Sequence, residues 1–308
     1  MKMKTENKLK TFCRGLRRDW ELIVMILPIV IFFLVFAYYP MYGVVIAFKK
    51  FSVVRGILGS PWVGMKYFIR FFESPYVFRL LRNTLLISVY NIVWGFPVPI
   101  LFALMLDEIK NKGFKRVVQT VSYLPHFVST VVICSMIFDL VSTNGPINGI
   151  LDKVLGVKIN FLGDPRWFRT IFVGSGIWQG FGWNSIIYLA AITGINPDLY
   201  EAAEMDGANR LRQVWHVTLP GIKPTILTLL ILSLGNALSV GYEKIILLYS
   251  PATYETADVI SSYVYRTGLL NAEYSYSAAV GLFNSVVNIM VLFLFNWVGK
   301  KFFEVRIF

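Results

Sequence analysis

Long apolar runs separated by short polar segments constrain the fold of this chain more than any other feature. Such runs can cross a hydrocarbon core, which takes about 20 helical residues. Six are expected, at Leu22–Phe48, Asn83–Leu106, Val117–Val141, Trp167–Ile195, Ile222–Tyr249 and Ser275–Val298. Runs of this length are typical of helices that satisfy their own backbone groups inside a bilayer. The sequence therefore predicts an all-α polytopic membrane protein with six transmembrane helices.

The composition agrees with a membrane protein and argues against a nucleic-acid partner. The chain of 308 residues is 56% hydrophobic and only 16% charged, whereas soluble domains carry about 25% charged residues. A net charge of +12 would point to nucleic acid in a soluble protein. Here the basic residues flank apolar runs, where they set the orientation of the spans.

The N-terminal segment, residues 1–21, is short and basic. The apolar run that follows is too long for a signal peptide and has no small-residue cleavage site, so we expect a retained first span. The basic segment is then cytoplasmic. Six spans make a membrane domain over residues 22–298 and place the tail, residues 299–308, in the cytoplasm as well. The expected location is the cell membrane, with several crossings.

A charged, soluble-looking segment, Asn196–Pro220, separates the fourth and fifth runs. Its first two residues, asparagine and proline, suit the N-cap and the first turn of a helix. Gly207 suits a left-handed residue that ends this helix. A second helix, about 208–217, is expected to stop before Pro220 and Pro224. The segment is predicted to be a cytoplasmic helix-turn-helix.

This segment resembles the EAA loop of the permease subunits of binding-protein-dependent ABC importers. Three pieces stand at the family's spacing: Glu201-Ala202-Ala203, Asp206-Gly207-Ala208 and Leu219-Pro220. The likeness runs from Leu22 to the C-terminus and is greatest to the maltose-type sugar permeases. It implies that the loop docks into a cleft on a separate ATPase subunit, with Glu201 as an acidic contact. An ordinary amphipathic loop on the membrane surface is the alternative.

The resemblance also implies the partners and the activity. They are a second homologous permease, two ABC ATPase subunits, an extracellular solute-binding lipoprotein and a saccharide, with an oligosaccharide favoured. ATP and Mg²⁺ would bind to the ATPase subunits, because this chain has no G-x-x-x-x-G-K-[ST] phosphate loop. No cofactor, catalytic residue or metal site is expected in the chain, since its cysteines and histidines are isolated. It would supply the path and the coupling, by alternating access, and would not be an enzyme itself.

Residues on the spans flanking the loop are candidates for the substrate path. Matching to the maltose-type family gives Gly176, Gln179, Gly180, Trp183, Leu232 and Asn236, and Tyr242 is a further aromatic candidate. Only Gly180 and Asn236 keep the family's residue type, so the substrate need not be maltose. Polar and small residues also join helices inside membranes, so both roles stay open. The pair Glu243-Lys244 is likewise expected either to neutralise itself or to line a pathway.

Two other functions compete with this prediction. An ion-coupled secondary transporter would need an acidic residue near the middle of a span, and the main candidate, Asp139, lies nearer an outer end. A non-transporting membrane scaffold or receptor would explain the polar loop but leave Gln179 and Asn236 without a purpose. The external loops carry net positive charge, which hints at an acidic sugar or an acidic binding protein.

Overall fold

The computed structural model describes residues 19–235 and 240–303, and these are almost entirely helical. Within them, the only extended pairing is an isolated bridge between Lys49 and Trp62. The chain divides into two compact units, residues 1–66 and residues 67–308. The predicted all-α class is confirmed.

The first unit is built on one helical stretch, Trp20–Phe48, which matches the first predicted span. Its parts are α2 (Trp20–Phe33), η1 (Leu34–Tyr38), α3 (Tyr39–Met41) and η2 (Tyr42–Phe48). The chain then turns through α4 (Gly56–Gly59). The rings of Phe48 and Trp62 stack with their centroids 5.7 Å apart, which ties the end of the span to the polar segment after it.

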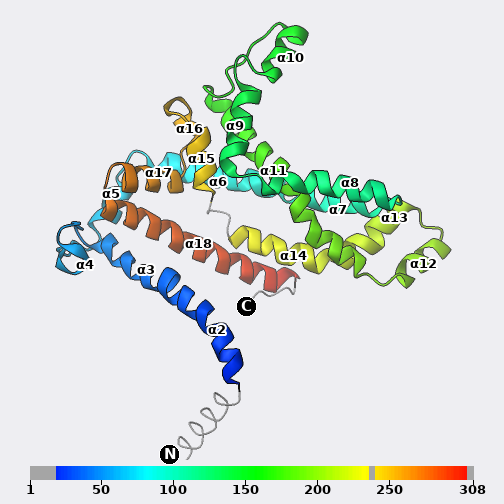
Figure 1. Cartoon of the computed structure of the whole chain (residues 1–308), viewed down its shortest axis with the longest axis horizontal. Coiled ribbons are helices and arrows are strands. Elements are labelled where there is room, and N and C mark those ends of the chain that lie inside the picture. The colour runs from blue at the N-terminus through cyan, green and yellow to red at the C-terminus, as the bar shows by residue number, and fades with distance from the viewer. Residues whose placement is uncertain (1–18, 236–239, 304–308) are drawn as a thin grey trace, which may run out of the picture. The chain divides into compact units, whose positions relative to one another are not determined.

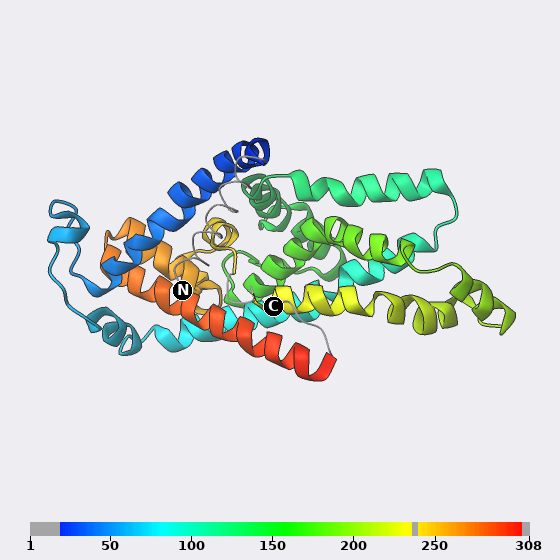
Figure 2. The ribbon, with the colours of Figure 1, turned by 90° about the horizontal axis from the view of Figure 1, so that it is seen from below.

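The second unit contains the remaining helices and is coloured from cyan to red in Figure 1. They are α5 (Lys66–Phe72), α6 (Val77–Tyr90), α7 (Pro97–Asp107), α8 (Lys112–Tyr123), α9 (Thr130–Val141), α10 (Pro146–Leu155), α11 (Pro165–Thr193), α12 (Asp198–Met205), α13 (Arg210–Gln213), α14 (Leu219–Gly235), α15 (Tyr242–Leu248), α16 (Tyr254–Ala257), α17 (Ile260–Tyr265) and α18 (Tyr274–Phe303). Short π and 3-10 segments join some of them: η3 (Asn91–Gly95), η4 (Leu124–Phe127), η5 (Val214–Thr218), η6 (Pro251–Thr253) and η7 (Arg266–Leu270). Within this unit, α7, α8, α11 and α14 run along a common direction, with α12 at one end and α17 at the other (Figures 1 and 2).

Five described stretches are long and apolar enough to cross a membrane. They are Trp20–Phe48, Val77–Asp107, Thr130–Leu155, Arg210–Gly235 and Tyr274–Leu294. Helix α11 has 29 residues, about 44 Å of helix at 1.5 Å per residue, so it is also long enough. It falls outside the apolar set because it carries polar residues such as Gln179 and Asn184.

The predicted third span, Val117–Val141, is wrong as a single crossing helix. Helix α8 ends at Tyr123 and passes through the 3-10 turn that contains Pro125, whose ring cannot continue a regular helix. Helix α9 starts afresh at Thr130, where the Ser129 hydroxyl accepts a hydrogen bond from the Val132 amide at 3.4 Å. Helix α9 therefore leaves α8 in a new direction (Figure 1). Helix α10 follows where an external loop was predicted.

The predicted helix stop before Pro220 and Pro224 is also wrong. Helix α13, η5 and α14 form one continuous stretch from Arg210 to Gly235. The π-helical turn of η5 ends directly before Leu219-Pro220, and η3 likewise precedes Pro97. A widened turn makes room for a proline ring and absorbs its missing N–H, so the helix continues. The predicted fifth span reached Tyr249, but residues 240–241 are not helical and α15 begins afresh at Tyr242.

Helix α11 organises the packing of the second unit. Its buried residues Tyr188 and Ile192 form one apolar cluster with Ile100 of α7 and Ile222 of α14. On another side, Gly182 lies so close to the Ser122 carbonyl of α8 that a Cβ there would overlap it. Nearer the other end of α11, Phe172 packs against α9 and α15. The helix thus contacts α7, α8, α9, α14 and α15.

Candidate functional site

The turn after α12 has the left-handed geometry that its sequence predicted. Gly207 has φ of +76°. Its amide donates to the Glu204 carbonyl at 3.0 Å, and the Ala208 amide donates to the Ala203 carbonyl at 2.8 Å. These paired bonds are those of a Schellman cap, which satisfies the last carbonyls of a helix. At the start of α12, the Asn196 side chain accepts from the Asp198 amide at 3.1 Å.

Side-chain contacts fasten α12 to the helix that follows. The hydroxyls of Tyr200 and Thr218 lie 3.0 Å apart. The Gln213 side chain, only 4% exposed, donates to the Ala208 carbonyl at 3.2 Å. The Asn209 side chain accepts from the Arg212 amide at 2.9 Å and so begins α13. The two helices of the turn are therefore held as one piece at the base of α14.

This piece presents carboxylates and apolar groups on its surface. Glu201, Ala202, Asp206 and Pro220 are exposed, while Ala203 and Leu219 are half-buried. Four large apolar side chains are also exposed, namely Leu199, Met205, Leu211 and Trp215. A hollow of about 300 Å³ lies beside α12 and is lined in part by Asp107, Glu201 and Glu204. Such a mixed surface can dock against another protein.

A cavity of about 470 Å³ lies between α6–η3–α7, α11, α14 and residues 240–241. Two predicted path residues, Gly176 and Gly180, line it. Its polar lining residues are Ser88, Asn91, Asn184 and Ser233, and its aromatic ones are Phe96, Phe181 and Tyr188. Within the described residues, none of the lining side chains is charged. Hydroxyl and amide groups beside ring faces suit a polyhydroxylated ligand.

Four other predicted path residues, Gln179, Trp183, Leu232 and Tyr242, do not line this cavity. The Gln179 amide donates to the Val128 carbonyl at 3.2 Å, and the Trp183 ring stacks on His126 with centroids 4.7 Å apart. Both therefore face the break between α8 and α9. Tyr242 stacks on Tyr265 at 6.0 Å. Leu232 is not among the lining residues either, and Asn236 lies outside the described residues.

Sequence reasoning did not select Ser88 and Asn91, which line the cavity from the second span. A signal was present, because both are polar residues inside an apolar run that carries two prolines. Asn184 and Ser233 lie on the two spans that were singled out, but only the packing shows that they face the cavity. One helix turn separates Asn184 from Gly180 on α11.

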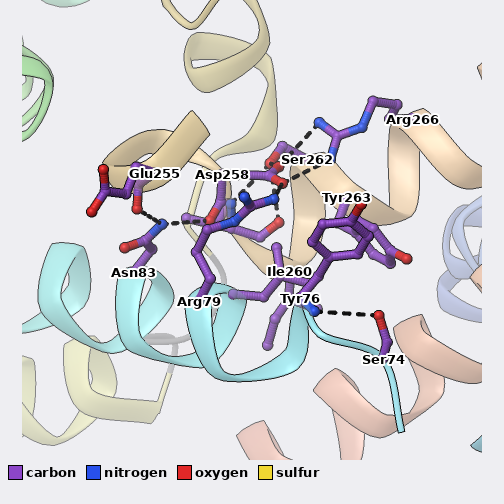
Figure 3. Close-up of polar contacts among 12 residues, drawn as sticks. Ser74, Tyr76, Arg79, Asn83, Glu255, Asp258, Ile260, Ser262, Tyr263 and Arg266 are labelled. Carbon is purple, nitrogen blue, oxygen red and sulfur yellow. Dashed lines mark hydrogen bonds and ion pairs between the residues drawn. The ribbon is translucent and has the colours of Figure 1, made fainter. Parts of the chain in front are cut away.

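A buried ionic cluster lies where α6 meets α16 and α17 (Figure 3). The Asp258 carboxylate is fully buried and pairs with Arg266 at 2.7 Å and Arg79 at 3.3 Å. The Asn83 amide donates to the Glu255 and Asp258 carbonyls. Burial works to lower the pKa of Arg266, but the hydrogen bonds and charge of Asp258 raise it above its ordinary value. The cluster fastens α6 to α16 and α17.

A second hollow, of about 430 Å³, opens beside this cluster. Its charged and aromatic lining residues are Arg70, Arg79, Arg266, Glu273, Tyr76, Tyr254 and Tyr263. The guanidinium of Arg70 pairs with Glu273 at 3.0 Å. Three guanidinium groups against the carboxylates of Glu273 and Asp258 leave one net positive charge at this hollow.

Long apolar helices around a cavity, with an exposed turn at one end, are typical of a membrane transport protein. Residues 95–304 match the family model described as "Binding-protein-dependent transport system inner membrane component", and the chain belongs to this family. The predicted relationship to importer permeases and the predicted membrane location are confirmed at this level. The family is one of transport components.

Individual relatives cover almost the whole chain. The Bacillus subtilis protein named "Polygalacturonan/rhamnogalacturonan transport system permease protein YteP" is 49% identical over 98% of this chain and 95% of its own length. LplB of the same organism is 42% identical over 99% and 96%. Among solved structures, a chain of a bacterial ABC transporter "involved in the import of the acidic polysaccharide alginate" is similar with a TM-score of 0.88. That chain is 44% identical, and the match covers 95% of this chain and 99% of that one.

Proposed function

We propose that this chain is the permease subunit of an ATP-driven ABC importer for oligosaccharides that carry carboxylate groups. The observation that carries the proposal is the 49% identity, over nearly the full length, to a permease named for polygalacturonan and rhamnogalacturonan. The likeness to the alginate importer supports the same substrate class. Both names describe polymers of acidic sugars.

The cavity suits such a ligand. Its amide and hydroxyl groups match sugar hydroxyls, and its three aromatic residues match the apolar ring faces. Since no described lining residue bears a carboxylate, an anionic sugar meets no like charge there. The arginine-rich hollow near Asp258 would draw the same anion towards that end of the unit.

Coupling follows from the continuous helix between the turn and the cavity. Helix α13, η5 and α14 cover 26 residues, about 39 Å of helix. About a third of the way along, the stretch is tied to α12 through Thr218, and near its far end Leu229 and Ser233 line the cavity. A push on α12 would therefore tilt the wall of the cavity. This geometry supports alternating access driven from the turn.

The remaining parts of the assembly follow from this role. Two ATPase subunits would grip α12 and bind ATP and Mg²⁺, a second permease would complete the path, and an extracellular binding protein would deliver the sugar. The turn and both termini would then lie in the cytoplasm. The residues proposed to contact the ATPase are Glu201, Ala202, Ala203, Asp206, Gly207, Leu219 and Pro220.

The test is uptake by the complete assembly in liposomes. The probes are trimers of galacturonate and of alginate, with a carboxyl-reduced trimer and maltotriose as neutral comparisons. We expect ATP-dependent uptake of at least one acidic trimer and little uptake of the neutral ones. Import of neutral sugars alone would refute the acidic substrate. Uptake that persists without ATPase subunits and collapses with an uncoupler would favour an ion-coupled transporter.

A further inference from the structure

Lys244 on α15 places a cation beside the cavity in an otherwise apolar setting. Its half-buried side chain lies near Cys134 and Phe172, which belong to one apolar cluster with Val240. The ammonium nitrogen is 5.3 Å from the centre of the Phe172 ring. Removing an ammonium group from water is unfavourable unless an opposite charge or enough hydrogen bonds compensate it. A cation in such a place therefore needs an explanation.

No carboxylate of the described residues lies within ion-pair distance of this amine. The adjacent Glu243 is exposed, so the two residues do not form the self-neutralising pair that was one of the expected alternatives. The carbonyl of Phe172 accepts a hydrogen bond from the amine at 3.3 Å. That carbonyl belongs to α11, whose own backbone hydrogen bonds supply it with a partner. Lys244 is thus not needed to satisfy it.

The amine approaches the cavity wall at Gly176, one of two glycines of α11 that line the cavity. A Cβ built on Gly176 would lie 3.6 Å from the Lys244 nitrogen. Gly176 lines the cavity, and so do Val240 and Gly241, about one helical turn before the lysine. Lys244 itself is not among the lining residues, so the amine lies behind the wall at Gly176. A side chain at position 176 would contact the amine, whereas the glycine puts no side-chain atom there.

We propose that Lys244 and the gap at Gly176 form a carboxylate-binding subsite, where the ammonium group pairs with a uronate unit of the transported sugar. This inference rests on the proposed function. An ammonium group in a partly buried place forms a strong charge-assisted hydrogen bond with a carboxylate. A single lysine binds a carboxylate as a point charge, without the bidentate hydrogen bonding of arginine. Such a contact selects acidic units and still lets them move on.

The decisive variant is Lys244→Met, which keeps the length of the side chain and removes its charge. Replacing a buried cation by an apolar residue of similar size is often neutral or stabilising, so the complex is expected to assemble. The probes are an acidic trimer that the parent assembly imports and the same trimer with its carboxyl groups reduced. We expect uptake of the acidic trimer at sub-saturating concentration to fall by about tenfold or more. Uptake of the reduced trimer should be unchanged or increased.

Two further variants sharpen the result. Gly176→Val should cover the amine and reproduce the loss for the acidic trimer, although the lysine is still present. Lys158→Met is the matched control, because it removes an exposed ammonium group whose partner is Asp152 at 3.7 Å. It should leave both rates as they are in the parent.

The outcomes separate this inference from the proposed function. If the parent imports the acidic trimer and Lys244→Met imports it equally well, the subsite is refuted and the proposed function stands. If Lys244→Met loses both trimers to the same extent, the lysine acts on the path in general and the subsite is again refuted. If the parent imports only the reduced trimer, the acidic substrate itself is wrong.

Discussion

Replacing Gly207 should uncouple ATP hydrolysis from uptake, because its left-handed backbone shapes the turn after α12. A Cβ built there meets no atom within 4 Å, and φ is +76°, so the cost of a side chain is purely a backbone cost. For residues other than glycine that cost is about 1–2 kcal/mol, which shifts the balance away from the turn by about 5- to 30-fold. The cost for valine, which is branched at Cβ, should lie at the upper end of this range. Asparagine tolerates this region and should cost least.

The assay is the number of ATP molecules hydrolysed per sugar imported by the full assembly in liposomes. We expect this ratio to rise in the order Gly207→Asn, Gly207→Ala, Gly207→Val, while insertion and assembly are retained. The bonds lost first would be those to the carbonyls of Ala203 and Glu204. Helix α12 would then no longer be held at a defined angle to α13.

Gly156 supplies a matched control for backbone strain. It also ends a helix, with φ of +65° and open space around its Cβ position, but it follows α10. Gly156→Val should therefore cost similar stability without changing the coupling ratio. Normal coupling in Gly207→Val, or equal uncoupling in Gly156→Val, would refute the role of the turn.

Two further predictions concern charge. Glu201→Lys reverses the charge of an exposed side chain on α12 and should reduce co-purification of the ATPase subunits severalfold. Asp152→Lys on α10 is the control. If both variants recover the ATPase subunits equally well, Glu201 does not contact them. Asp258→Asn keeps the shape of a fully buried side chain but leaves Arg79 and Arg266 without their shared carboxylate. It should destabilise the unit by about 3 kcal/mol, which would be measured as a lower thermal midpoint of the purified complex. An unchanged midpoint would show that the ionic cluster around Asp258 does not stabilise the unit.

Signals within a few residues of each other were sufficient for much of this protein. Long apolar runs predicted spans, because the bilayer forces the backbone to satisfy itself within each run. Gly207 predicted the turn, because left-handed glycines act through bonds to near neighbours. The predicted start was one residue early, since Pro197 and not Asn196 is the N-cap of α12. The pieces around Glu201 and Asp206 were sufficient to recognise the family. Each of these features depends on only one local stretch.

The sequence could not show which neighbours would override a local rule. Pro220 predicts a helix stop, yet a π-helical turn before it carries the helix on to Gly235. Gln179 and Trp183 carry the polar and aromatic groups expected of a path, but packing turns them towards the break between α8 and α9. Rotation of a helix about its own axis changes which neighbour each side chain faces, and only packing against the neighbouring helices fixes that rotation.

The tertiary structure alone decided which residues meet. Asp258 and Arg79 are 179 positions apart in the chain, and Lys244 and Gly176 are distant as well, so no local pattern links either pair. The cavity takes its walls from three separate helical stretches and residues 240–241. Chain positions this far apart become neighbours only when whole helices pack. The sequence by itself therefore determined the class of protein and the shape of the turn. Packing determined the cavity, the ionic cluster around Asp258 and the position of Lys244 beside Gly176.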